Sequence, residues 1–126
     1  MLGQEIALVP REKSNMVVQT LCEESLQKFL TYLNPAKIIG GLLEFDRLLE
    51  EKLQLHLSNP LRIRLLVHCG CALERSVTRT PLHYKEDKSQ VDTVKLKALR
   101  EAASVFSESL KLELDEDEYY FMVNLL

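Results

Sequence analysis

Apolar side chains recur along this chain every three or four positions, which is the spacing of amphipathic helices. The first run begins near Ser14 or Asn15, whose side chains can cap a helix, and Asn34-Pro35 ends it. The apolar positions of this first predicted helix are Leu26, Phe29, Leu30 and Leu33.

A second helix is predicted over residues 36–57. Asp46, Arg47 and Glu50 are expected to face water, and Gly40-Gly41 to fray or bend the first turn or to permit a close helix contact. The apolar stripe of this helix is Ile38, Leu42, Phe45, Leu49 and Leu53.

Three more helices follow. The third covers residues 60–76 after the break at Ser58-Asn59-Pro60, and a polar loop runs over residues 77–89. The fourth covers residues 91–110, with Leu99, Ala103, Phe106 and Leu110 on one face. The fifth opens at Asp115, and its apolar residues are Tyr119, Phe121, Met122 and Leu125. The clearest alternating fragment, Leu112-Glu113-Leu114, is too short for a strand, so the pattern predicts an all-α bundle of five helices.

Length and composition fit one ordinary globular domain. The chain has 126 residues, of which 46% are hydrophobic and 28% charged, and its net charge is −3 with both signs interleaved. Phosphate backbones need a clustered basic face, so we expect no direct nucleic-acid partner. No membrane span or signal peptide is evident, and three cysteines at irregular spacing suggest free thiols in a reducing cytoplasm. Residues 1–14 are interpreted as a leader or inter-domain linker and residues 15–126 as the domain.

The usual catalytic and metal-binding motifs are missing. There is no Gly-rich phosphate loop, nucleophile elbow or His-Glu-x-x-His. Cys69 and Cys71 are two apart on a helix, so their side chains diverge and we expect no metal site. The acidic run 115–118 is interpreted as a helix cap, with Glu118 at the capping-box position. His56 and His83 are interpreted as surface or helix-end residues.

His68 stands inside the apolar run Leu65 to Leu73, where an unpaired polar group costs roughly 1–3 kcal/mol. It is either a hydrogen-bonded core histidine or a reactive one. Arg64 lies one turn before it and Arg75 two turns after it on the same face. A neutral imidazole accepts a phosphoryl group without a separate base, and guanidinium groups can bind the phosphate. On geometry alone the two interpretations remain open.

A resemblance adds to this geometry. The segment Leu65-x-x-His68-x-x-x-Ala72-x-Glu74-Arg75 resembles the histidine motif of the PTS regulation domain, a helical module of bacterial sugar-responsive transcription regulators. Three further segments resemble that family in order and spacing, over about residues 15–126. They are Thr80-Pro81-Leu82, Ala102-Ala103 with Phe106, and the acidic stretch 112–118 followed by Tyr119 and Phe121.

The resemblance implies a dimerising five-helix bundle, phosphorylated on His68 by HPr or by a sugar-specific enzyme II component. Arg64 and Arg75 would be the phosphate-contacting residues, and no cofactor is implied. The family's second histidine is absent, since its position falls on Leu125 or, one residue earlier, on Asn124. With this single motif histidine, the chain is most similar to the C-terminal module of levanase-operon-type sigma-54-dependent activators.

The sequence therefore predicts a non-enzymatic regulatory module of a larger transcriptional activator. The alternative is a constitutive helical interaction or dimerisation module in which His68 is a structural core residue. A small enzyme using His68 as acid or base is disfavoured because the sequence shows no carboxylate to orient the imidazole.

Overall fold

The computed structural model describes residues 11–126, with side chains from residue 13 onward. Five α-helices account for most of this part of the chain, and none of its residues forms a strand. The predicted all-α fold is therefore confirmed. The helices are α2 (Arg11–Phe29), α3 (Pro35–Leu53), α4 (Asn59–Thr78), α5 (Thr93–Ala102) and α6 (Glu116–Leu125), with a short 3-10 helix η1 (Lys88–Gln90) and a π-helical turn η2 (Phe106–Leu110).

Most helix boundaries fall where the sequence places a cap. The Asn34 side chain accepts a hydrogen bond from the Ala36 backbone N–H, and Ser58 caps α4 in the same way through Leu61. The first helix begins at Arg11, a few residues earlier than Ser14 or Asn15. Residues 1–10 of the expected leader lie outside the described residues, while residues 11–14 belong to α2.

The continuous helix predicted over residues 91–110 is wrong in detail. The chain turns at Ala103, and residues 106–110 form the π-helical turn η2. Tertiary contacts account for the break: Phe106 stacks on Phe45 at 5.0 Å between ring centroids, and Leu110 lies against Gly41. These contacts hold η2 on α3, on which α5 also packs. The close contact expected at the Gly40-Gly41 pair is thereby confirmed at Gly41.

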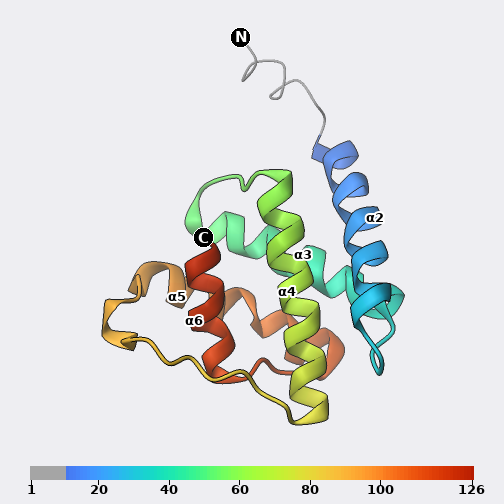
Figure 1. The fold of residues 1–126 in the computed structure, drawn as a ribbon. Helices are drawn as coiled ribbons and strands as arrows, with labels where there is room; N and C mark the ends of the chain where they lie inside the picture. Colours follow the sequence, from blue (N-terminus) through green and yellow to red (C-terminus); the bar gives the residue numbers. More distant parts are fainter. Residues whose placement is uncertain (1–10) are drawn as a thin grey trace.

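Helix α4 lies against three of the other four α-helices of the described chain. It packs on α2, α3 and α6, whereas α5 packs on α3 and α6. Figure 1 shows α4 (green) upright near the middle, with α2 (blue) along one side and α6 (red) along the other. Residues on successive faces of α4 therefore meet three different helices.

The predicted apolar stripes of the second and fourth helical segments lie in the core. Leu42, Phe45 and Leu49 are fully buried, as are Leu99 and Phe106. One predicted position of the first helix is wrong: Phe29, in the last turn of α2, is 62% exposed, although its neighbour Leu30 packs against the core.

The face of α3 expected to meet water is also partly wrong. Arg47 is exposed as predicted, but Asp46 and Glu50 are buried. The reason is Arg62 on α4, itself only 2% exposed, whose Nε donates to Asp46 Oδ2 at 2.8 Å. A buried cation thus draws two carboxylates into the bundle.

Gly70 marks the closest approach of α2 to α4. A Cβ atom at this position would lie 2.6 Å from Leu26 Cδ2, whereas one at Gly40 would have no neighbour within 4 Å. We expect Gly70→Val to lower the free energy of unfolding by about 1–3 kcal/mol through overpacking. The control Gly40→Ala should raise it by about 0.5–1 kcal/mol, since alanine favours an exposed helical position. Urea unfolding measures both, and equal effects at the two glycines would contradict the close packing at Gly70.

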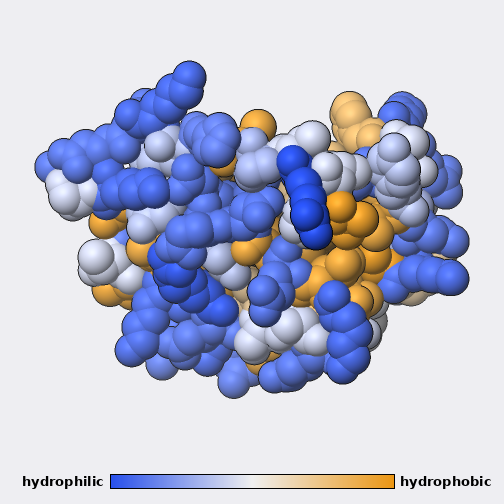
Figure 2. Space-filling view, turned by 90° about the horizontal axis from the view of Figure 1, so that it is seen from below, coloured by the Kyte–Doolittle hydropathy of each residue, from blue (hydrophilic) through white to orange (hydrophobic). Residues whose placement is uncertain are grey.

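No helix in residues 11–126 is long and apolar enough to cross a membrane. The face seen from below is mostly hydrophilic, with an apolar area among hydrophilic residues (Figure 2).

Candidate functional site

His68 lies beside a buried ion pair that joins α4 to α6. Its Nε2 is 3.2 Å from Oε1 of Glu118. The same carboxylate accepts two hydrogen bonds from Arg75, at 2.7 Å from Nε and 2.9 Å from an Nη. Glu118 has no exposed surface, whereas the side chains of His68 and Arg75 are 21% and 23% exposed. The structure thus brings His68 and Arg75 together through a residue from the last helix.

The cluster keeps Glu118 ionised. Burial acts to raise the pKa of this carboxyl, but the contacts with His68 and Arg75 outweigh it and hold the pKa below its usual range. Glu118 is thus a fixed negative charge against the imidazole.

The sequence-based interpretation of Glu118 was wrong. As predicted, Asp115 occupies the N-cap position of α6, but its side chain makes no capping hydrogen bond. Glu118 does not reach back to the cap either. One helical turn into α6, its side chain points inward to the bundle, where the guanidinium of Arg75 compensates its charge. A carboxylate that can orient the imidazole is therefore present, and spacing within one helix could not reveal it.

Glu74, beside Arg75 in the sequence, fastens a different part of the bundle to α4. Its carboxylate accepts hydrogen bonds from the backbone N–H groups of Thr31, Tyr32 and Leu33 at 2.7–3.0 Å. These bonds to the α2–α3 connection lower the pKa of Glu74, against an opposing effect of burial. The Glu-Arg pair of the motif therefore fixes two separate segments of the chain to the end of α4.

We expect Glu74→Ala to lower the free energy of unfolding by about 1–3 kcal/mol, because three backbone donors lose a charged acceptor. Exposed Glu51, which pairs with Arg47 on the surface, provides the control, and Glu51→Ala should cost at most about 1 kcal/mol. Amide hydrogen exchange should also quicken at residues 31–33. Unchanged protection there would contradict the anchoring role.

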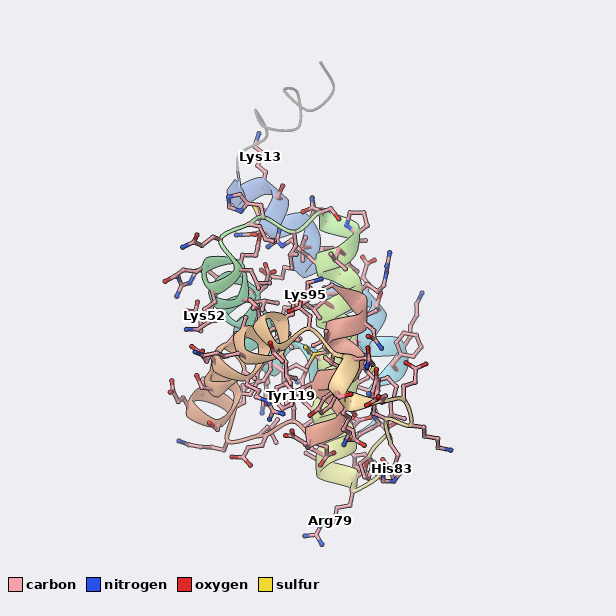
Figure 3. All side chains as sticks on the ribbon, turned by 90° about the vertical axis from the view of Figure 1, so that its left-hand side faces the viewer. Lys13, Lys52, Arg79, His83, Lys95 and Tyr119 are labelled. Atoms are coloured by element: carbon pink, nitrogen blue, oxygen red, sulfur yellow. The ribbon has the colours of Figure 1, made fainter. Side chains whose placement is uncertain are left out.

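The remaining predicted residues lie on the surface. Arg64 is exposed and makes no ion pair with any residue that the structure describes. His56 is 84% exposed, with Nδ1 3.3 Å from a Glu50 oxygen, and His83 is exposed in the loop after α4. Figure 3 shows His83 and Arg79 at the lower edge of the molecule. The interpretation of His56 and His83 as surface residues is confirmed.

A second buried charge cluster, around Arg62, was missed from the sequence. Besides Asp46, the Arg62 guanidinium donates to the side-chain oxygens of Asn15 and Asn59, and it lies 3.8 Å from Glu50. Burial and the proximity of Glu50 raise the pKa of Asp46 to about 6 despite Arg62. The cluster borders an open hollow of about 630 Å³ and links α2, α3 and α4.

The cysteines behave as structural residues. Cys22 and Cys69 are buried, Cys71 is half-buried, and all three are free thiols. Cys69 Sγ packs against Met122 Sδ at 3.2 Å, and burial raises the pKa of the Cys69 thiol well above its usual range. Within residues 11–126 no group of three or more His, Cys, Asp or Glu side chains is placed to hold a metal ion.

The helical bundle and its histidine motif define the class of this protein. The chain belongs to the PRD domain family, which matches residues 44–126, from the middle of α3 to the end of α6. The resemblance seen in the sequence is therefore confirmed at the level of the family.

Two relatives are transcriptional regulatory proteins. The chain is 30% identical to the transcriptional regulatory protein LevR of Bacillus subtilis (strain 168) over 112 residues, which are 87% of this chain and 12% of LevR. It is 28% identical over 118 residues to the transcriptional regulatory protein DagR of Salmonella typhimurium (strain 14028s / SGSC 2262), covering 91% of this chain and 13% of DagR. The chain thus spans about an eighth of the length of these relatives. No solved structure matches.

Proposed function

We propose that this chain is a phosphorylatable regulatory module of a bacterial transcriptional regulator. His68 accepts a phosphoryl group from HPr or from a sugar-specific enzyme II component and thereby controls sugar-utilisation genes. The module works in the cytoplasm and adjusts other domains of a larger activator, in keeping with its match to a small part of two transcriptional regulators.

The position of His68 against the Arg75–Glu118 ion pair carries this proposal. A phosphoryl group brings a charge of about −1.5 to −2. Next to Glu118 that charge weakens the ion pair by repulsion and competes for the guanidinium of Arg75. The ion pair joins α4 to α6, so its weakening on phosphorylation changes how α6 packs on α4.

Arg64 complements Arg75 in this scheme. It lies one helical turn before His68, it is exposed, and no described residue neutralises it. Arg64 can therefore bind the phosphate without breaking an ion pair, whereas Arg75 can do so only on release from Glu118.

His68 acts as a single site in a module that forms a homodimer. The family's second histidine position is Leu125 or Asn124. The exposed side chains of Met16 and Val17 on α2, 67% and 51% exposed, offer apolar surface for a second copy.

The test is phosphoryl transfer from phosphoenolpyruvate through enzyme I and HPr, with the enzyme II components added. We expect acid-labile phosphate on the wild-type chain and on His83→Ala, and none on His68→Ala. Circular dichroism is the control that checks whether both variants are folded. Absence of label on the wild type, or label that persists in His68→Ala, would overturn the assignment.

One observation favours a second candidate, a constitutive helical interaction module with a structural histidine. Nε2 of His68 has no contact with solvent, as in a core histidine. An NMR titration separates the two functions. An imidazole that does not titrate between about pH 5 and 8 and takes no phosphate would favour the structural role.

A further inference from the structure

The two ring nitrogens of His68 have different surroundings. Nε2 is buried and faces Oε1 of Glu118 at 3.2 Å, off the line of a well-directed hydrogen bond. The side chain as a whole keeps 21% of its surface exposed, so its accessible part lies elsewhere on the side chain. Nδ1 makes no hydrogen bond with the described residues and is not among their buried polar atoms without a partner, so it reaches solvent and only Nε2 is enclosed by the ion pair.

We infer that His68 takes the phosphoryl group on Nδ1, and that Glu118 is the positioning residue that keeps the ring proton on Nε2. This inference rests on the proposed function, since it names the atom that the phosphodonor meets.

Repulsion between lone pairs selects the tautomer. A neutral imidazole carries one proton, and the other nitrogen presents a lone pair. A proton on Nδ1 would turn the Nε2 lone pair toward the carboxylate of Glu118, while a proton on Nε2 turns an N–H toward it. The second arrangement is attractive, and it leaves the lone pair on Nδ1 free for attack.

Arg75 prevents Glu118 from moving aside. Both carboxylate oxygens accept hydrogen bonds from its guanidinium, and the carboxylate is fully buried. A tetrahedral phosphoryl group on Nε2 would need the space that Oε1 fills at 3.2 Å. Transfer to Nε2 would require the ion pair to open first, and transfer to Nδ1 does not.

The chemical step balances without a further reactant. The Nδ1 lone pair forms a bond to phosphorus while the bond from phosphorus to the donor atom breaks, and the donor keeps that electron pair. His68 loses no proton, so the ring becomes a phosphoimidazolium with its N–H on Nε2. Glu118 then faces the N–H of a positive ring, and this attraction offsets part of its repulsion from the phosphate.

The experiment uses the whole chain labelled with ¹⁵N-histidine. Long-range ¹H–¹⁵N correlation spectra assign the tautomer of His68 before modification and the phosphorylated nitrogen afterwards. The donors are the phosphoenolpyruvate system and, in parallel, phosphoramidate, a small donor that needs no docking surface. We expect the Nε2–H tautomer before modification and phosphate on Nδ1 with both donors.

Each other result has a distinct meaning. Phosphate on Nε2, or a predominant Nδ1–H tautomer, would overturn this inference while the proposed function stands. No phosphate on His68 with either donor would overturn both.

A variant tests the part played by Glu118. Glu118→Gln keeps the shape but removes the charge, and we expect a mixture of tautomers and at least a tenfold slower phosphorylation. Glu116→Gln, which removes an exposed charge paired with Arg100, should change neither. If Glu118→Gln does not fold, the wild-type spectra still decide the phosphorylated atom. A folded Glu118→Gln with the wild-type tautomer and rate would overturn the positioning role.

Discussion

Replacing Arg75 with Leu is expected to lower the free energy of unfolding by about 3–5 kcal/mol, because it leaves a buried carboxylate without its counter-charge. Glu118 has no exposed surface, and the two hydrogen bonds from Arg75 are its direct link to a cation that is always charged. Urea unfolding followed by circular dichroism measures the loss.

Two comparisons show whether the loss comes from the buried pair. Arg100→Leu breaks an exposed ion pair with Glu116 and should cost at most about 1 kcal/mol. The double variant Arg75→Leu/Glu118→Leu should recover much of the stability lost by Arg75→Leu, since no buried charge remains. Equal losses in Arg75→Leu and Arg100→Leu would contradict the burial of this charge.

The contribution of Glu118 to the free energy of unfolding also depends on pH, and its direction follows from the pKa of this carboxyl. Its pKa is lower in the folded chain than in the unfolded one, so the folded state favours the ionised form. The stabilisation is complete above the unfolded pKa, near 4.5, and is lost as the pH falls through the lower folded value. Arg75→Leu should therefore cost less at acidic pH than at neutral pH.

Replacing Arg62 with Met should lower the free energy of unfolding by about 3–5 kcal/mol at neutral pH, because two buried carboxylates would lose the guanidinium between them. Arg62 is 2% exposed and lies between Asp46 and Glu50. Arg47→Met, which removes an exposed arginine bound to Glu44 and Glu51, is the matched control and should cost at most about 1 kcal/mol.

The pH dependence around Asp46 has the opposite sign to that around Glu118. Its pKa is raised to about 6 in the folded chain, so the folded state holds the proton more tightly. This contribution to stability is fully present below the unfolded pKa, near 4, and is lost as the pH rises through about 6. Removal of Arg62 raises the proton affinity of the carboxylates further.

Arg62→Met should therefore be less destabilising at pH 5 than at pH 7.5, because the buried carboxylates are protonated more readily at the lower pH. Urea unfolding at the two pH values makes this comparison. An equal loss in the free energy of unfolding at the two pH values would contradict the placement of Arg62 between two carboxylates.

Local rules predicted the helices well and the contacts between them poorly. Asn34, Ser58 and the prolines after them act within a few residues of backbone, so the sequence displays their effect directly. The run 91–110 looked continuous because its helical spacing does not reveal that Phe106 meets Phe45 and Leu110 meets Gly41 from a distant helix.

The largest differences between the sequence-based predictions and the structure concern charged residues. Asp46, Glu50 and Glu118 were assigned to solvent or to a helix cap because burial of an isolated charge is costly. Each is buried beside an arginine on α4, at separations of 12 to 43 residues along the chain. His68 and its motif were found from the sequence, whereas the carboxylate beside it depends on how α6 docks.

The chain has four tyrosines and no tryptophan, and this gives the docking of α6 an optical signal. Tyr119 and Tyr120 belong to α6, and Tyr84 stacks on Tyr120 at 5.4 Å between ring centroids. Tyr119 also lies under the guanidinium of Arg100, 5.2 Å from the ring centroid (Figure 3 shows its position). Three of the four tyrosines thus lie on or against α6, while Tyr32 is exposed in the α2–α3 connection. A change in intrinsic tyrosine fluorescence can therefore report a movement of this helix in unlabelled protein and in real time.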